Sequence, residues 1–353
     1  MDLLYKGILK IMKLRHLLLL VGLVGIGIIV LVNLGDAPQF FAALRHFHWY
    51  AVLLMILVQF VSYYTTARYY QAFFAISDYE VDLRHLFEAS LAINFVNQAV
   101  PSAGVAATTY LIEAIRPSVS TGAATLAQLG RYIFTFVSYF IVLAVGFLFL
   151  FLGSGDRLDQ FSVRLVLVLM LAVLAAGIVL LAVFSERSRL EATLAPVIGL
   201  VNVIGTKLLR RKRLPLGPAR MKRFLDEIYR GYELVKERKD RWPVFLGWSL
   251  AYNIAEVMTL YIVFIGLGSW INPGVVITAY TLAIIASSIG FITGGVGIYE
   301  LSMIGAFVAL GVPFTLAFSS VLVYRILSMI LFLPPGFYFY RRHLLADSAE
   351  LAK

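Results

Sequence analysis

Five ionisable side chains lie inside long apolar stretches of the sequence. They are Glu113, Arg131, Glu256, Glu300 and Arg325. A charge at membrane depth is costly unless protein or water covers it, so such residues are candidates for a binding or transport site. Arginine binds phosphate through a planar fork of donors, and a neighbouring carboxylate balances that charge or carries a proton. The alternative is a network of ion pairs that only holds helices together, and we favour this alternative for Glu256.

The apolar sequence is broken at two places. Residues 291–300 contain three glycines followed by a carboxylate, and residues 99–105 contain a weaker copy. Glycine is unfavourable inside a helix, and a broken backbone at membrane depth is tolerated only where protein or a water-filled cavity covers it. We therefore predict the turns of two re-entrant hairpins that line a substrate path, although a tight contact between small residues is an alternative. The break residues are Pro101, Gly104, Gly294, Gly295 and Gly297.

Polar side chains flank both breaks. Asn94 and Asn97 precede the first break, Tyr299 follows the second, and Tyr324 lies in the next apolar stretch. Such side chains either pair with backbone groups freed by the break or contact a lipid head group. We include all four in the predicted substrate-binding site.

The composition defines the fold class. The chain has 353 residues, of which 61% are hydrophobic, whereas soluble domains are near 45–50% apolar. We predict an all-α polytopic membrane protein, since a spanning helix needs ~20 apolar residues and several stretches meet that length. The predicted spans are Leu17–Leu34, Trp49–Phe73, Thr121–Leu152, Val163–Phe184, Pro243–Leu267 and Pro313–Tyr340. The broken regions, Leu83–Arg116 and Pro273–Leu310, each predict a helix followed by a shorter second arm.

The distribution of Lys and Arg predicts the orientation, because cytoplasmic loops are basic. It places both termini in the cytoplasm and opens the two hairpins to opposite sides, which gives an inverted repeat, a common plan in transporters. Arg131 and Arg325 lie at equivalent depths, since each is ~15–18 Å past its helix start at 1.5 Å per residue. The predicted segments are 1–48 (cytoplasmic N-terminus and first helix), 49–152 (first repeat, hairpin 83–116), 153–242 (a helix and a basic amphipathic segment), 243–340 (second repeat, hairpin 273–311) and 341–353 (cytoplasmic tail).

Charge and motifs limit the function classes. The net charge of +10 indicates basic loops on anionic lipid rather than nucleic-acid binding, and residues 207–223 are the predicted contact with the inner leaflet. Arg68, Arg84 and Glu88 lie near predicted helix ends, where side chains reach the interface. Cysteine is absent, and no catalytic or metal-binding motif is present, so we expect no enzyme activity, cofactor or metal. A homodimer is left open.

The second break resembles the C-terminal signature of the membrane domain of lysylphosphatidylglycerol synthetases, which is described as flippase-like. The matching residues are Thr293-Gly294-Gly295-Val296-Gly297-Ile298-Tyr299-Glu300, Gly311-Val312-Pro313 and Tyr324-Arg325. Residues 94–104 and Arg131 resemble its N-terminal signature, and the resemblance covers roughly residues 50–340. Relatives often carry glycines and an acidic residue where Ser102, Ala103 and residues 106–109 stand. We expect no aminoacyl-transferase domain, so the resemblance implies lipid translocation rather than lipid synthesis.

These observations lead to an expected function. We expect a transporter or flippase of the cytoplasmic (inner) membrane that moves a lipid with an anionic head group, such as a phospholipid or a polyprenyl-phosphate-linked species. Arg131 and Arg325 would bind the phosphate, and Glu113 and Glu300 would balance the arginines or couple protons. The alternatives are a non-transporting membrane partner of a glycosyltransferase or lipid-modifying enzyme, and a secondary transporter of small solutes.

Overall fold

The computed structural model describes residues 45, 47–99, 104–116, 118–154, 171, 233, 236–289 and 298–350. In these ranges the chain forms helices joined by short turns and contains no strand, which confirms the predicted all-α fold class. The elements are α3 (Trp49–Phe74), η2 (Ala75–Ser77), α4 (Leu83–Ala99), α5 (Val105–Ile115), α6 (Thr121–Ser154), η5 (Lys239–Arg241), α10 (Trp242–Gly266), α11 (Pro273–Ile289), α12 (Ile298–Ala309) and α13 (Phe314–Glu350).

Four of the described helices are long and apolar enough to cross a membrane, namely α3, α6, α10 and α13. Their bounds match the predicted spans within two residues, except that α13 continues ten residues past Tyr340 to Glu350. The polar residues from Arg341 onward end the apolar stretch but favour helix as much as the residues before them. The predicted spans Leu17–Leu34 and Val163–Phe184, and the basic segment 207–223, lie outside the described residues.

Each broken region forms two helices, as predicted. The first consists of α4 and α5, and α5 begins after Gly104, which has a left-handed backbone with φ of +83°. The second consists of α11 and α12. The end of α12 is set by Gly311, whose φ is +86°, because the amide of Val312 then reaches back to the carbonyl of Phe307 at 2.9 Å. Pro101 and the glycines at 294, 295 and 297 lie outside the described part of the chain.

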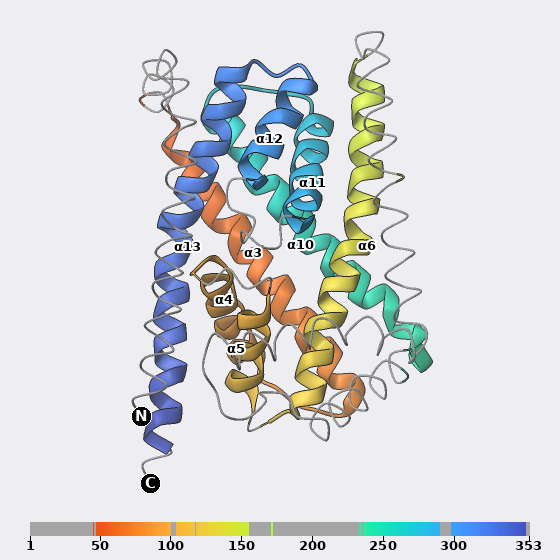
Figure 1. Ribbon diagram of the computed structural model, residues 1–353, viewed down its shortest axis with the longest axis vertical. Coiled ribbons are helices and arrows are strands. Elements are labelled where there is room, and N and C mark those ends of the chain that lie inside the picture. The colour runs from red at the N-terminus through yellow and green to blue at the C-terminus, as the bar shows by residue number, and fades with distance from the viewer. Residues whose placement is uncertain are drawn as a thin grey trace, which may run out of the picture.

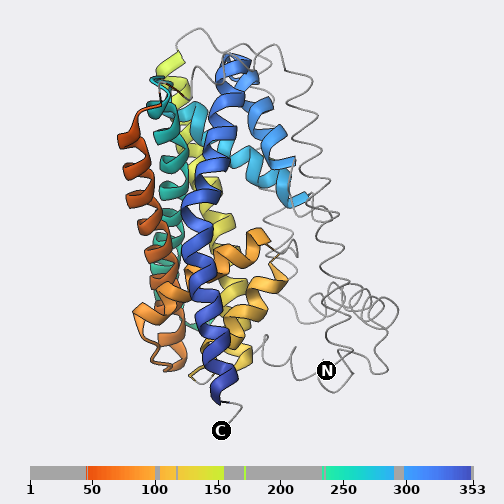
Figure 2. The ribbon, with the colours of Figure 1, turned by 90° about the vertical axis from the view of Figure 1, so that its left-hand side faces the viewer.

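The helices α3 and α10 pack antiparallel, run diagonally through the view of Figure 1 and lie along one edge of the bundle in Figure 2. The start of α3 meets the end of α10, where the amide and the ring Nδ1 of His48 approach the carbonyl oxygen of Gly266 at 2.9 and 3.0 Å. The α4–α5 pair lies low and the α11–α12 pair lies high in both views (Figures 1 and 2). The first arm of each pair packs on a helix distant in sequence, because α4 contacts α13 and α11 contacts α6.

The buried side chains of α3 and α10 change character along the crossing. The apolar core has two main clusters: Met55 of α3 belongs to the cluster around α11 and α12, and Ala67 belongs to the cluster around α4 and α5. The buried face of α3 between those residues is polar, as is the facing part of α10. The buried polar residues are Gln59, Ser62, Thr65, Thr66, Ser249, Asn253, Glu256 and Thr259. A polar layer therefore lies between two apolar ones, in the middle of the bundle.

The close contact of α11 with α6 requires a glycine. A methyl group added at Gly274 would meet the carbonyl oxygen of Gly146 and, at 2.6 Å, the amide nitrogen of Leu150. Gly274→Ala should therefore lower the melting temperature of the purified protein, although alanine is favoured over glycine in a helix by about 1 kcal/mol. Gly247→Ala in α10 is the matched control, because no atom lies within 4 Å of its added methyl group. Equal melting temperatures for the two variants would contradict this packing.

Candidate functional site

A cavity occupies the polar layer between the two helix pairs. We call it the central cavity and divide it into two adjoining lobes, which share Gln59, Tyr63, Asn94, Asn97, Tyr252, Glu256 and Ile284 in their walls. The larger lobe has a volume of about 610 Å³ and contains Arg131. The smaller lobe has a volume of about 270 Å³ and contains Arg325. Side chains from both halves of the chain therefore meet at one site.

Arg131 lies on α6 in the wall of the larger lobe. Its guanidinium lies over the ring of Tyr252 at 5.0 Å and near that of Tyr70 at 5.9 Å, and its Nη2 donates to Thr66 Oγ1 at 3.4 Å. No carboxylate among the described residues comes within 4.0 Å of it. Aromatic faces attract a cation but, unlike a carboxylate, do not neutralise its charge. Arg131 can therefore bind an anion.

Arg325 occupies the equivalent position on α13 but has a different environment. Its Nε lies 2.8 Å from Oε1 of Glu300, and the two side chains are 25% and 8% exposed. The ring of Tyr299 lies 5.5 Å from the guanidinium. Glu300 thus balances Arg325, whereas no described carboxylate balances Arg131 in this way. The two arginines match in sequence position and differ in charge pairing.

Glu256 lies on α10 between the two lobes and is 8% exposed. Its Oε1 accepts hydrogen bonds from Gln59 Nε2 at 2.9 Å and from Ser62 Oγ at 2.6 Å. Both donors are neutral groups of α3. The α3–α10 crossing therefore contains a carboxylate that is hydrogen-bonded but lies beyond 4.0 Å of any described Lys, Arg or His nitrogen.

The polar residues before the first break also reach the cavity. Asn94 donates to the hydroxyl of Tyr63 at 2.8 Å and accepts from Gln98 at 3.2 Å, and Asn97 lines both lobes. From the second half, Tyr299 and Tyr324 line the smaller lobe. Asn94 thus bonds to Tyr63 of α3 and to Gln98 of its own helix, and all four residues line the central cavity.

Glu113 lies away from the central cavity. It is in α5, where its Oε1 pairs with Arg116 at 3.1 Å and the two side chains are largely exposed. The expectation that Glu113 balances Arg131 is therefore wrong. The reason is the register of α5, which turns this face outward and cannot be read from composition. Gly104 lies beside the cavity wall, because a methyl group added there would meet the hydroxyl of the cavity residue Tyr132.

Three polar residues of α3 that line the central cavity were not among the predicted site residues. Gln59, Ser62 and Thr66 recur at helical spacing and all face the cavity. Their spacing within a span that is otherwise apolar is the signal that could have identified them. In the described ranges, no three His, Asp or Glu side chains gather as ligands for one metal ion.

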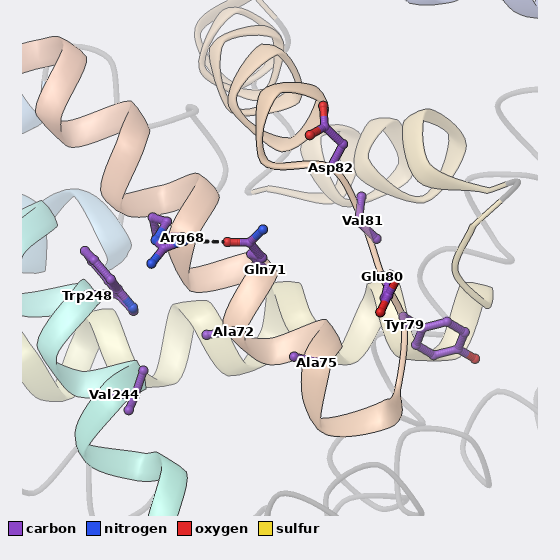
Figure 3. Close-up of a pocket in the computed structure, with 10 residues that line it drawn as sticks. All are labelled: Arg68, Gln71, Ala72, Ala75, Tyr79, Glu80, Val81, Asp82, Val244 and Trp248. Carbon is purple, nitrogen blue, oxygen red and sulfur yellow. Dashed lines mark hydrogen bonds between the residues drawn. The ribbon is translucent and has the colours of Figure 1, made fainter.

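A second hollow lies at the end of α3 that adjoins α4, with a volume of about 800 Å³ (Figure 3). Arg68 contacts the face of Trp248 at 5.5 Å and donates to Gln71 Oε1 at 2.8 Å. Glu80 and Asp82 line the opposite side. Arg68 thus lines a hollow that is separate from the central cavity, and its reach to the membrane interface stays a prediction.

Glu88 was predicted to reach the membrane interface, but the structure buries it. It is 7% exposed and lies 3.2 Å from Arg84 and 3.4 Å from Arg342 of α13. Next to it, His343 Nε2 lies 3.6 Å from the same carboxylate, and its Nδ1 lies 2.5 Å from the hydroxyl of Tyr110. This cluster joins α4 and α5 to the last helix of the chain.

The fold and the site define a multi-pass α-helical membrane protein with two discontinuous helix pairs around a polar cavity. Residues 17–336 match the family described as the lysylphosphatidylglycerol synthase TM region, and the chain belongs to this family. It is also 40% identical over 80 residues to a UPF0104 membrane protein of Methanothermobacter thermautotrophicus. That match covers 23% of this chain and 24% of the relative.

The Arg325–Glu300 pair gives a stability test. Arg325→Gln should lower the free energy of unfolding by roughly 3 kcal/mol, because it leaves a buried carboxylate without its partner. The double variant Arg325→Gln/Glu300→Gln should recover most of that loss. Thermal melting of the purified variants measures both effects. A double variant no more stable than Arg325→Gln alone would contradict a direct pairing.

Proposed function

We propose that the protein moves a lipid with an anionic head group between the two leaflets of the cell membrane, and that Arg131 binds the head group. The proposal is supported above all by Arg131, a half-buried arginine that lines the central cavity with no described carboxylate within 4.0 Å. An arginine at membrane depth needs an anionic partner. Phosphate is suitable, because its oxygens match the guanidinium fork.

The size and lining of the central cavity support this ligand class. The larger lobe, at about 610 Å³, is within the ~300–1,000 Å³ range of small-molecule sites and suits a head group rather than a whole lipid. Asn94, Asn97 and Tyr132 offer further hydrogen bonds around Arg131. The acyl chains would remain in the bilayer beside the bundle.

The arrangement of the helices supports an inverted repeat formed by residues 49–152 and 243–340. The two halves cross antiparallel through α3 and α10, and their helix pairs lie at opposite ends. In such transporters the site lies at the repeat interface near the midplane, and access alternates between the two sides. We propose that the hairpins are re-entrant, that both termini are cytoplasmic, and that the basic segment 207–223 contacts the anionic inner leaflet.

Retained lipid tests the role of Arg131. Arg131→Gln should weaken retention of phosphatidylglycerol by roughly tenfold or more, the equivalent of one lost charged hydrogen bond. Arg131→Lys should recover part of the retention, since it keeps the charge and loses the fork. Mass spectrometry of lipids bound to the purified protein after incubation with defined phosphatidylglycerol–phosphatidylcholine mixtures measures both.

The control for this test is Arg116→Gln, which removes an exposed arginine outside the cavity. It should leave retention unchanged. Selective loss of phosphatidylglycerol in Arg131→Gln supports the proposal, whereas equal retention by Arg131→Gln and the native protein would refute it.

The proposed topology gives a separate prediction. The chain contains no cysteine, so Ser118→Cys, between α5 and α6, and Ser269→Cys, between α10 and α11, can each be labelled alone. A membrane-impermeant maleimide should label Ser269→Cys in intact cells and Ser118→Cys only after the membrane is opened. Labelling of both from the outside would contradict the inverted repeat.

A further inference from the structure

The two carboxylate oxygens of Glu256 have different surroundings. Gln59 and Ser62 both donate to Oε1. In the part of the chain that the structure describes, no hydrogen bond reaches Oε2, although the residue lines both lobes of the cavity. One oxygen is thus fixed in place by α3, and the other is available to a proton or a water molecule.

A purely structural role would leave a different pattern. A carboxylate that only joins helices is paired with a cation or bonded through both oxygens, as Glu300 is paired with Arg325 at 2.8 Å. Glu256 has two neutral donors on one oxygen. A buried carboxylate without a cationic partner tends to bind a proton and become neutral. The geometry therefore fits a group that changes its protonation state.

Among the described residues around the central cavity, Glu256 is the only candidate for binding a proton near neutral pH. The other carboxylate near the cavity, Glu300, is held by Arg325. Tyrosines ionise far above neutral pH. The groups on the elements around Glu256 are Tyr63 on α3, Arg131, Tyr132 and Tyr139 on α6, Tyr252 on α10 itself, Tyr280 on α11, Tyr299 and Glu300 on α12, and Tyr324 and Arg325 on α13.

We propose that Glu256 is the proton-binding residue of the central cavity and takes up a proton when an anionic head group binds Arg131. This inference rests on the proposed function. The proton comes from water and adds to Oε2, so the carboxylate becomes a neutral acid. No covalent bond of the lipid changes.

The physical reason is charge balance inside the cavity. When the cavity holds no lipid, ionised Glu256 partly offsets Arg131, since opposite charges attract strongly where water is scarce. An anionic head group replaces that partner and repels the ionised carboxylate. Protonation removes the repulsion, so lipid binding and proton binding strengthen each other by the same factor. A pH difference across the membrane would then bias lipid movement.

The first arm of the test looks for the proton itself. Infrared difference spectra of the purified protein, recorded as the pH is changed, should contain the carbonyl band of a buried carboxylic acid. Glu256→Gln should remove this band, and Glu256→Asp should shift it. Glu113→Gln, which alters an exposed carboxylate, should leave it unchanged. A band that persists unaltered in both Glu256 variants would overturn the proposal.

The second arm measures coupling to the lipid. Retention of phosphatidylglycerol by the native protein should fall roughly tenfold as the pH rises from ~6 to ~8, the effect of a coupling near 1.4 kcal/mol. Glu256→Gln should retain the lipid equally at both pH values. The same pH dependence in the native protein and in Glu256→Gln would refute the coupling, whether or not the infrared band is present.

The two arms separate this inference from the proposed function. Failure of the proposed function appears as undiminished retention of phosphatidylglycerol in Arg131→Gln. Failure of the inference appears as an unaltered infrared band, or as pH-dependent retention in Glu256→Gln, while Arg131→Gln still loses the lipid.

Discussion

The structure depends on one requirement: polar groups placed in the middle of an apolar bundle must find their partners within the protein. The crossing of α3 and α10 meets it in part, although Ser249 Oγ and Asn253 Oδ1 have no hydrogen-bond partner among the described residues. Gln59 and Ser62 of α3 bond to Glu256 of α10, and Asn253 of α10 donates to the carbonyl oxygen of Thr135 in α6 at 3.2 Å. Because α3 and α10 belong to different halves of the chain, the same hydrogen bonds join the halves and form the wall of the cavity.

The two halves contain the same order of long and short helices, but their arginines have different partners. Arg325 has a carboxylate partner in its own half, Glu300. Arg131 has aromatic rings and a threonine, and the nearby carboxylate of the layer, Glu256, is bonded to α3 instead. The asymmetry concentrates unbalanced charge in one lobe. A symmetric pair of arginine–carboxylate bridges would leave no group free to bind an anion.

Much of the fold could be predicted, because apolar length and broken backbone are properties of short segments. Four spans and both helix pairs followed from such segments. The partners of the ionisable residues could not be predicted, since they depend on which faces of the helices pack together. Glu113 and Glu300 both lie in short arms after a break, yet one turns outward to Arg116 and the other inward to Arg325. Glu88 lies near a helix end but is buried, because α13 extends far enough to cover it.

The ion pairs of Glu88 with Arg84 and Arg342 affect how the helices pack during synthesis. Arg342 is 254 residues further along the chain than the carboxylate that it pairs with. Among the described residues, Arg84, an exposed neighbour on the same helix, is then the one cation of the first half within 4.0 Å of Glu88. Domains generally fold as units during synthesis, but the surface of α4 that contacts α13 cannot pack until α13 is made. During synthesis Glu88 therefore lacks its Arg342 partner until α13 has been inserted into the membrane.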